Sequence, residues 1–265
     1  MFLVIFEFSE LHFTTNNFYI VIMSVTPYSA QDGTKKDQVK TMFNRIAPRY
    51  DLLNHLLSFG IDRKWRKRVV KMVKGMKAPV ILDVATGTGD LAIALSKSHP
   101  SAVYGVDISV GMLEKARQKV QKLGLQHTII LKEADSEALP FDRNTFDVVT
   151  VAFGVRNFGD LNAGLTEMGR VLKPGGKLIV LEFSRPANFP MKQLYNFYFK
   201  RILPLWGGLI SKDKEAYTYL PASVMEFPEG EIFETELVNA GLHPEKSIRQ
   251  TFGIATIYVA LKPLQ

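Results

Sequence analysis

Three observations in the sequence predict a doubly wound α/β fold with a mostly parallel sheet. Short apolar runs alternate with helical lengths from residue 80 to residue 182, which is the pattern of β-α-β units. The first of these runs ends at a glycine-rich turn, residues 86–89, and a helical pattern follows it directly. The last two apolar runs flank Gly253, and their connection is too short for a parallel crossover, so they should form an antiparallel pair.

Three helices are expected before the first strand of the sheet. A helix over residues 37–46 should stop before Pro48, because the residue preceding a proline disfavours helical geometry. A second helix over residues 50–59 should end at Gly60, and Asp62 should cap a third that runs to about Val73. The third helix carries the basic residues Arg63, Lys64, Arg66, Lys67, Arg68, Lys71 and Lys74. These charges form either a solvated face over an apolar stripe or a surface that rests on anionic lipid.

The parallel sheet is predicted from five apolar runs with helical patterns between them. The strands are expected at residues 80–82, 102–106, 128–132, 146–152 and 177–182, and the helices at residues 91–95, 110–123 and 160–172. The last of these helices should stop at the Lys-Pro-Gly-Gly turn of residues 173–176. Because crossovers between parallel strands are right-handed, the carboxyl ends of the strands should form one edge, where ligands bind.

The regular alternation breaks between residues 184 and 228, where aromatic and large apolar residues are dense and prolines and glycines punctuate the chain. This segment predicts either an insertion that forms a lid over the carboxyl edge, or aromatic side chains that simply pack against the sheet. A helix over residues 230–240 and two strands, at residues 242–251 and 255–261, should follow. We therefore expect a single domain over residues 37–265, with residues 184–228 as a substrate lid.

Residues 1–36 are predicted to be an N-terminal extension that is disordered or reflects a mis-assigned start. The first 22 residues begin apolar, but Glu7 and Glu10 interrupt the run and no basic residue precedes it, so the pattern of a secretory signal is missing. The run is also too short and too polar to cross a bilayer. It indicates an upstream start codon, with Met23 beginning the working protein, or else a peripheral membrane anchor. Residues 24–36 have the composition of a flexible lead-in.

The composition excludes several chemistries. The chain of 265 residues has no cysteine, which rules out disulfides, thiolate catalysis and cysteine-ligated metal, and which fits a reducing cytoplasm. We expect no metal site. The net charge of +7 indicates an anionic partner surface, either nucleic acid or a membrane.

The glycine turn predicts the binding of a nucleotide-like cofactor. Gly87 and Gly89 belong to a loose G-x-G-x-x-A pattern, and Asp107 lies 20 residues beyond Gly87, as in a dinucleotide site. However, Asp83 closes the strand and Asp90 follows the turn, whereas a pyrophosphate disfavours nearby anions. S-adenosylmethionine carries no phosphate, and its ammonium and sulfonium groups suit carboxylates. The local chemistry therefore favours the methyl donor over NAD; a turn that only packs strand against helix is the structural alternative.

Other stretches connect the chain to a known family. Residues 83–89, Asp107, Asp135 and the turn at residues 173–176 together resemble class I methyltransferases that use S-adenosylmethionine. Three more selective stretches, at residues 42–54, 153–158 (Phe-Gly-Val-Arg-Asn-Phe) and 181–184 (Leu-Glu-Phe-Ser), resemble the menaquinone and ubiquinone C-methyltransferase family. The resemblance runs from about Asp37 to Lys262 and so covers nearly all of the chain except the N-terminal extension.

The resemblance implies S-adenosylmethionine as the cofactor, with the family's contacts falling on Thr88, Asp107, Asp135 and Ser136. Asp107, at a strand end, can accept hydrogen bonds from both ribose hydroxyls. Asp135 and Ser136 would meet the adenine edge, and Thr88 with the glycine backbone would hold the methionine end. The family often has a serine where this chain has Ala152, so a hydroxyl contact is lost there. The predicted cofactor site comprises Asp83, Thr86, Gly87, Thr88, Gly89, Asp107, Asp135 and Ser136.

The resemblance also implies the reaction, which is methyl transfer to a ring carbon of a polyprenylated quinol, foremost demethylmenaquinol. Carbon methylation needs an electron-rich ring, so a phenolate must be stabilised beside the methyl group in a pocket free of water. Arg156 is the candidate for this task, directly or through a water, because an arginine cannot serve as a free base. Tyr50, Asp51 and Asn157 are candidates to complete the network. His55 is the natural titrating base by residue type, or else a structural histidine in an apolar helix.

A polyprenylated quinol resides in the bilayer. The basic third helix, the aromatic insertion and the lack of a spanning segment fit a cytoplasmic enzyme that associates peripherally with the inner face of the membrane. One rival is a methyltransferase that acts on RNA or on another small molecule; the charge permits RNA, but no recognised RNA-binding module is present. A non-catalytic S-adenosylmethionine-binding protein is the other rival. We expect no nucleic-acid partner, and the sequence leaves a homodimer open.

Overall fold

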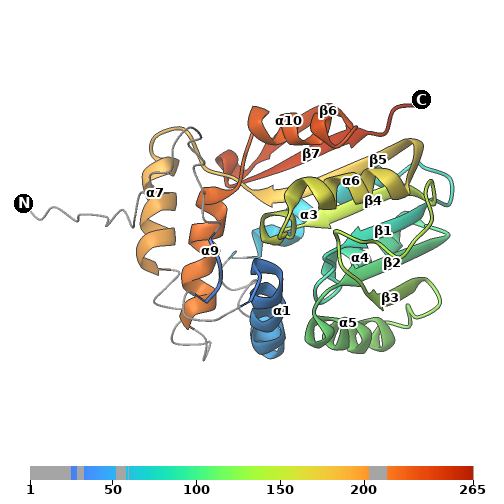
Figure 1. The fold of residues 1–265 in the computed structure, drawn as a ribbon, viewed down its shortest axis with the longest axis horizontal. Coiled ribbons are helices and arrows are strands. Elements are labelled where there is room, and N and C mark those ends of the chain that lie inside the picture. The colour runs from blue at the N-terminus through green and yellow to red at the C-terminus, as the bar shows by residue number, and fades with distance from the viewer. Residues whose placement is uncertain (1–24, 29–32, 52–57, 59, 203–213, 265) are drawn as a thin grey trace, which may run out of the picture.

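The structure is a computed structural model, and it describes residues 25–28, 33–51, 58, 60–202 and 214–264 (Figure 1). Residues 1–24 and most of the helix predicted over residues 50–59 lie outside this part of the chain. The start-codon hypothesis, which concerns residues 1–22, therefore also lies outside the described residues.

A seven-stranded sheet forms the centre of the molecule, with the strand order β3-β2-β1-β4-β5-β7-β6. The strands are β1 (Val80–Val84), β2 (Ala102–Asp107), β3 (Ile129–Glu133), β4 (Phe146–Ala152), β5 (Leu172–Phe183), β6 (His243–Gln250) and β7 (Ala255–Leu261). The first five pair in parallel, whereas β7 is antiparallel to both β5 and β6. This arrangement confirms the predicted fold class. The strand order reverses between β1 and β4, which is the switch point where such folds bind ligands.

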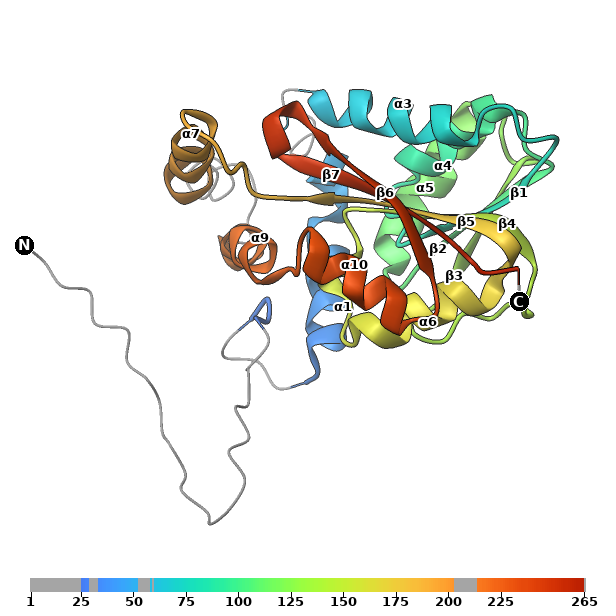
Figure 2. The ribbon, with the colours of Figure 1, turned by 90° about the horizontal axis from the view of Figure 1, so that it is seen from above.

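Helices cover both faces of this sheet (Figure 2). On one face lie α3 (Ile61–Val73), α4 (Asp90–Leu95) and α5 (Val110–Lys122), whose apolar side chains pack on the sheet around Val69, Leu95 and Val120. On the other face lie α6 (Leu161–Val171) and α10 (Glu231–Asn239), which bury Leu165 and Phe233. The central strands are apolar on both faces because both faces are covered.

Several boundaries differ from the predicted ones. The prediction that Asp62 caps the third helix is wrong, because Gly60 is the N-cap residue of α3 and Asp62 lies in its first turn. The helix predicted from residue 37 begins earlier, as α1 (Lys35–Ile46), because Thr34 caps it and forms a capping box with Asp37. The turn predicted at residues 173–176 lies inside β5, since β4 pairs with Leu172 before it and with Lys177 after it. The bulge is held by main-chain hydrogen bonds of 2.9 Å between its glycines and Lys262 at the end of β7.

The lead-in before α1 also differs from the flexible segment that the sequence predicts over residues 24–36. Tyr28 is buried, with 2% of its surface exposed, and packs in a cluster with Val39 and Met42 of α1. Its main-chain nitrogen donates to the side chain of Gln38 at 2.9 Å. The local composition is polar, but a single aromatic side chain anchors residues 25–28 to α1.

The segment between β5 and α10 contains α7 (Met191–Phe197), the π-helical turn η4 (Tyr198–Ile202) and α9 (Lys214–Glu226). In Figure 1, α1 and α9 lie next to the carboxyl edge of the parallel strands, and α7 lies beyond α9. The sequence left open whether the aromatic residues of this segment pack on the sheet or line a pocket. Tyr195 and Tyr219 are buried and line a cavity next to the sheet edge. Tyr195 also packs with Phe183 of β5, whereas Tyr219 packs in the cluster on α1.

A glycine of α6 allows the turn after β4 to pack closely. A Cβ built on Gly164 would lie 2.5 Å from Cδ2 of Phe158, the last residue of the Phe-Gly-Val-Arg-Asn-Phe stretch.

We expect Gly164→Ala to lower the free energy of unfolding by about 1–3 kcal/mol, because the Phe158 ring must shift in a packed core. Urea unfolding followed by circular dichroism measures this loss. Thr166→Ala, at an exposed position of the same helix, should change stability by less than about 0.5 kcal/mol. Equal stability of Gly164→Ala and the wild type would contradict the close packing.

Candidate functional site

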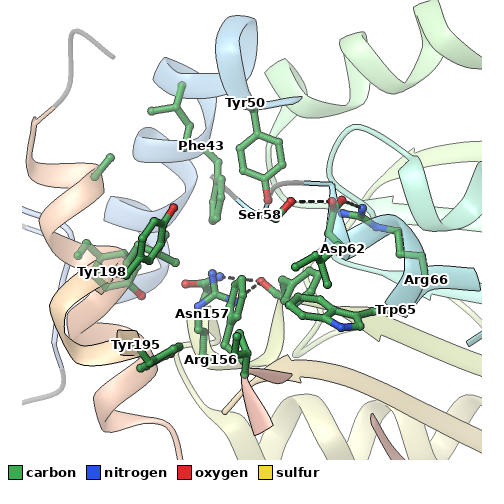
Figure 3. A pocket seen from close by; sticks show the side chains of 18 of the residues that line it. Phe43, Tyr50, Ser58, Asp62, Trp65, Arg66, Arg156, Asn157, Tyr195 and Tyr198 are labelled. Carbon is green, nitrogen blue, oxygen red and sulfur yellow. Dashed lines mark hydrogen bonds and ion pairs between the residues drawn. The ribbon is translucent and has the colours of Figure 1, made fainter. Parts of the chain in front are cut away.

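An apolar cavity of about 270 Å³ lies at the carboxyl edge of the sheet (Figure 3). Its walls come from α1, the start of α3, the turn after β4, the end of β5, and the helices α7 and α9. In Figure 3, Tyr50 and Phe43 lie opposite Arg156 and Asn157, with Trp65 on one flank and Tyr195 and Tyr198 on the other. The cavity is thus lined by aromatic rings and by a few polar groups, as is typical of small-molecule sites.

The wall nearest the sheet is a cluster of three aromatic rings. Phe153 and Phe183 lie with ring centroids 4.5 Å apart, and Trp65 lies 6.0 Å and 6.2 Å from them. The indole nitrogen of Trp65 donates to Thr251 Oγ1 at 2.9 Å, so the indole is fixed although its ring faces the cavity. A flat apolar ligand could stack against this wall.

Two smaller cavities, of about 70 and 30 Å³, follow the glycine turn. The first is lined by the end of β2 and by the turns that follow β2 and β3, including Asp107, Asp135 and Ser136. The second is lined by residues 85–88 with Asp83 and Asp90. Tyr50 and Phe153 line both of these and also the large apolar cavity. The three spaces therefore meet at these two side chains.

The glycine turn needs its glycines for backbone conformation. Gly87 and Gly89 have φ values of +57° and +81°, in the left-handed region. A Cβ on Gly89 would also lie 3.2 Å from the Cβ of Ala116 in α5, whereas a Cβ on Gly87 would face open space within the cleft. Gly87 thus leaves room for a ligand, and Gly89 allows α4 and α5 to pack closely.

Asp107 is built into this turn. It is buried, and its two carboxylate oxygens each accept one main-chain hydrogen bond of 2.8 Å, from Gly87 and from Ser109. Burial raises the pKa of this carboxyl to about 6, although the two donors oppose the shift. Each oxygen keeps acceptor capacity, so the group can receive two hydroxyl donors from a ligand in the adjoining cavity.

Asp83 and Thr86 support the turn from within. Asp83 accepts from Thr86 Oγ1 at 2.6 Å and from Thr150 Oγ1 at 2.7 Å, and burial raises its pKa to about 6. Since Thr150 belongs to β4, this carboxyl ties β1, the turn and β4 together. Asp83 and Thr86, both predicted to bind the cofactor, line the cavity of about 30 Å³. Because they are hydrogen-bonded to each other, they mainly stabilise the turn.

Asp51 lies beside Thr88 and not beside Arg156, the residue with which the sequence grouped it. Thr88 Oγ1 donates to Asp51 Oδ1 at 2.5 Å, and Lys119 Nζ donates to Asp51 Oδ2 at 2.9 Å and to Thr88 at 3.1 Å. Lys119 also forms an ion pair with Asp90. This cluster borders the second small cavity. Sequence reasoning missed Lys119, because one basic residue among the many of α5 gives no signal by itself.

Asp135 is paired with α1. Lys36 Nζ lies 2.7 Å from Asp135 Oδ2 and 2.6 Å from Glu137 Oε2, and the other oxygen of Asp135 accepts from the main chain of Glu137 at 2.9 Å. Asn44 of α1 similarly accepts from Ser109 Oγ and from the main chain of Gly111. These polar contacts hold α1 along the cavity of about 70 Å³, which Ser136 also lines. A ligand amine at Asp135 would share that carboxylate with Lys36.

Arg156 forms a buried ion pair with Glu182, the last polar residue of β5. Arg156 lies in the short 3₁₀ turn η3 (Val155–Asn157), and its Nη1 donates to Glu182 Oε1 at 2.7 Å and to the carbonyl of Phe153 at 2.6 Å. The side chains are only 7% and 0% exposed. Burial raises the pKa of Glu182, whereas the guanidinium opposes this shift. The Leu-Glu-Phe-Ser stretch contains Glu182, but the sequence suggested no role for it.

Polar atoms without a protein partner gather near this ion pair. Among the residues that the structure describes, Arg156 Nε, Asn157 Oδ1, Glu182 Oε2 and Tyr219 OH are buried and make no hydrogen bond. Arg156, Asn157 and Tyr219 line the apolar cavity, so a ligand with oxygens could use these groups. Burial also raises the pKa values of Tyr195, Tyr198 and Tyr219, which keeps these phenols neutral. His55 lies outside the described residues.

Comparison with known sequences identifies relatives over nearly the whole chain. The model of the ubiE/COQ5 methyltransferase family matches residues 31–262. A protein of Bacteroides fragilis named demethylmenaquinone methyltransferase is 48% identical over 239 residues, which cover 90% of this chain and 97% of the relative. A Geobacter sulfurreducens protein named ubiquinone/menaquinone biosynthesis C-methyltransferase UbiE is 48% identical over 233 residues, covering 87% and 91%.

Solved structures share the fold at much lower sequence identity. The [4+2]-cyclase SpnF is 17% identical with a TM-score of 0.64, and the alignment covers 87% of this chain and 97% of that one. A SAM-dependent methyltransferase from Aquifex aeolicus is 20% identical with a TM-score of 0.55, covering 74% and 89%. At these identities the likeness establishes the fold alone.

Acidification should weaken the binding of S-adenosylmethionine through Asp107. An ionised carboxylate is the form that can accept two hydroxyl donors, and burial raises the pKa of this one to about 6. Affinity should therefore be constant above neutral pH and fall by up to about tenfold per unit below pH 6. Isothermal titration calorimetry between pH 5 and 8 measures this dependence. Asp107→Asn should bind more weakly and keep only the pH dependence that other groups such as Asp83 contribute. A parallel pH dependence in both proteins would contradict this role.

Removal of the charge of Glu182 should destabilise the fold. Glu182→Gln leaves the Arg156 guanidinium buried without a counter-charge, and we expect a loss of about 3–5 kcal/mol in the free energy of unfolding. Urea unfolding measures it. Lys173→Met, which removes the partially exposed ion pair with Asp147, should cost less than about 1 kcal/mol. Equal losses for the two variants would show that the buried pair is no more important than a surface pair.

Proposed function

This chain belongs to the ubiE/COQ5 methyltransferase family, and we propose that it methylates a ring carbon of a polyprenylated quinol, foremost demethylmenaquinol, with S-adenosylmethionine as the methyl donor. The names of the two relatives support this substrate class. The enzyme is an S-adenosylmethionine-dependent methyltransferase on family grounds, and the identity of its acceptor is the proposal.

The apolar cavity meets the two smaller cavities beside the glycine turn, which together we call the cleft, and this supports the proposal most directly. Tyr50 and Phe153 line all three spaces, so a ring in the large cavity would lie next to a cofactor in the cleft. The aromatic wall of Trp65, Phe153 and Phe183 suits a flat quinol ring. The cavity is small and mostly apolar, which favours a quinol ring over an RNA strand.

The residues of the cleft suit the parts of S-adenosylmethionine. Asp107 would accept from the ribose hydroxyls, because both of its oxygens keep acceptor capacity beside the cavity. Asp135 and Ser136 would hold the adenine edge. At the other end, Thr88 and Asp51 would hold the methionine ammonium, in competition with Lys119. When bound, S-adenosylmethionine supplies a methyl group on a positively charged sulfur.

Arg156 is the residue proposed to activate the acceptor ring. A quinol becomes a strong carbon nucleophile when one hydroxyl loses its proton, and the resulting phenolate needs a fixed positive charge in a dry site. The guanidinium has donors to spare, since Nε makes no hydrogen bond among the described residues. Asn157, whose Oδ1 is also without a partner, would accept from the second ring hydroxyl. Arg156 itself stays protonated, so the proton leaves through another group or a water.

Glu182 positions Arg156 in this scheme. Its carboxylate and the carbonyl of Phe153 both accept from one guanidinium nitrogen. Because the guanidinium is planar and rigid, these two hydrogen bonds also fix the directions of its other N–H donors. Part of the positive charge is balanced in the resting site, which makes the burial of Arg156 tolerable before substrate binds.

We also propose that residues 184–228 act as a lid and that the enzyme contacts the cytoplasmic face of the membrane. The described parts of that segment supply Leu194, Tyr195, Tyr198 and Tyr219 to the cavity wall, away from the sheet. Within the described residues, no helix is both long and apolar enough to cross a bilayer. The exposed basic residues of α3 would face anionic headgroups.

Methyl transfer from radiolabelled S-adenosylmethionine into a bacterial lipid extract tests the function. We expect label in the methylated quinol that forms from a demethylated one, and Arg156→Ala should lower the rate by about 100-fold or more because the phenolate loses its counter-charge. Calorimetry should show that the variant still binds S-adenosylmethionine. Arg143→Ala, an exposed arginine away from the cavity, serves as the matched control and should retain the wild-type rate. Label in RNA or in a polar product would refute the substrate, and full activity of Arg156→Ala would refute the role of the arginine.

A further inference from the structure

An aromatic side chain projects from the turn between β6 and β7. Phe252, in the 3₁₀ turn η5 (Thr251–Gly253), is 78% exposed. Thr251 and Phe252 have φ values of +44° and +58°, so two consecutive non-glycine residues occupy the left-handed region. Such conformations are costly and are maintained only where the surroundings enforce them. The fold therefore holds a phenylalanine in solvent, where it adds nothing to the core.

More exposed apolar side chains lie around α7. Phe189 is 81%, Leu194 57% and Phe197 60% exposed. Figures 1 and 2 show α7 at the end of the molecule where the β6–β7 turn also lies. The contact between them is direct, since Ile254 packs in one cluster with Tyr195 and Tyr198. Scattered single apolar residues need no explanation, but four large ones at one end of a molecule indicate an interaction site.

The mouth of the apolar cavity lies at this end. Leu194 lines the cavity and is also more than half exposed, so it marks the point where the cavity reaches the surface. Met191 and Ile254, from α7 and from the β6–β7 turn, line the cavity beside it. We call Phe189, Leu194, Phe197 and Phe252 the mouth surface.

Positive charge borders the mouth surface on one side. Trp65 Nε1 donates to Thr251 at 2.9 Å and Arg68 donates to Gln250 at 3.2 Å, so the first turns of α3 lie against η5. Arg63, Lys64 and Lys67 of these turns are exposed, and no ion pair involves them within the described part of the chain. Exposed aromatic residues beside unpaired cations are the combination that binds the interface of an anionic bilayer.

We propose that the mouth surface inserts into the interfacial layer of an anionic bilayer, with Arg63, Lys64 and Lys67 on the headgroups. The cavity then opens toward the acyl chains, and the prenyl tail of a quinol can stay in lipid while its ring enters the site. This inference rests on the proposed function and identifies the residues that contact the membrane. The basic helix α3 alone would contact only the headgroups, whereas the aromatic residues set how deeply the protein inserts and how it is oriented on the bilayer.

Sedimentation with phosphatidylglycerol-containing vesicles tests the docking of the full chain. The wild type should bind these vesicles and bind phosphatidylcholine vesicles more weakly. The double variant Phe197→Ser/Phe252→Ser should bind the anionic vesicles at least about tenfold more weakly than the wild type, because two large side chains no longer enter the interface. The matched control is Ile232→Ser/Val238→Ser on α10, where the two positions are 64% and 57% exposed, and it should bind as the wild type does.

The outcomes separate this proposal from the proposed function. On a water-soluble naphthoquinol without a prenyl tail, Phe197→Ser/Phe252→Ser should retain the wild-type rate, and on a long-tailed quinol in vesicles its rate should fall with vesicle binding. Two results would refute the proposed membrane contact: wild-type protein that does not bind anionic vesicles, or a double variant that binds them as well as the wild type does. A double variant that changes from dimer to monomer in sedimentation velocity also overturns it, because the surface would then join two copies of the chain. Failure of every protein to methylate the soluble quinol rejects the proposed function and leaves the vesicle result standing.

Discussion

The buried ion pair between Arg156 and Glu182 is the interaction on which the site depends. It links the turn after β4 to the end of β5, two neighbouring strands of the sheet. The same guanidinium nitrogen holds the carbonyl of Phe153, so the turn cannot change shape without breaking the pair. Phe153 in turn lines both the apolar cavity and the smaller cavity beside the glycine turn. One charged contact thereby fixes a residue that the two cavities share.

This contact also explains how a charge can persist in an apolar site. A lone guanidinium would be costly among Trp65, Phe153 and Phe183, whereas a paired one is tolerable and keeps donors for a ligand. Because the surroundings exclude water, any interaction with a phenolate is stronger there than in solvent. Methyl transfer needs little from the protein beyond such electrostatic support and close alignment of the two reactants. The apolar cavity, the buried charge and the cavities beside the glycine turn lie together at the switch point of the sheet, as the proposed reaction requires.

The sequence predicted the fold well because its signals are local. Apolar runs of strand length, the glycine turn and the helical pattern that begins at Asp160 each depend on neighbouring residues, and most strands appeared within about two residues of their predicted positions. The exceptions have tertiary causes. Residues 173–176 continue β5 because β7 offers hydrogen bonds to their glycines, and residues 25–28 are anchored because Tyr28 finds a cluster on α1. Partners of this kind, distant along the chain, leave no trace in local composition.

What the sequence by itself determined is the class of fold, the family and the residue types at the carboxyl edge, including Asp107 and Arg156. These follow from periodicity, from glycine conformation and from motifs that lie in consecutive residues. Only the tertiary structure decided which of these residues act together. It joined Asp51 to Thr88 and Lys119, gave Arg156 its partner Glu182, and packed Ile254, which follows η5, against Tyr195 of α7. The reason is physical: a side chain's pairing depends on the burial and distance of groups far away in the chain, and those are properties of the packed molecule.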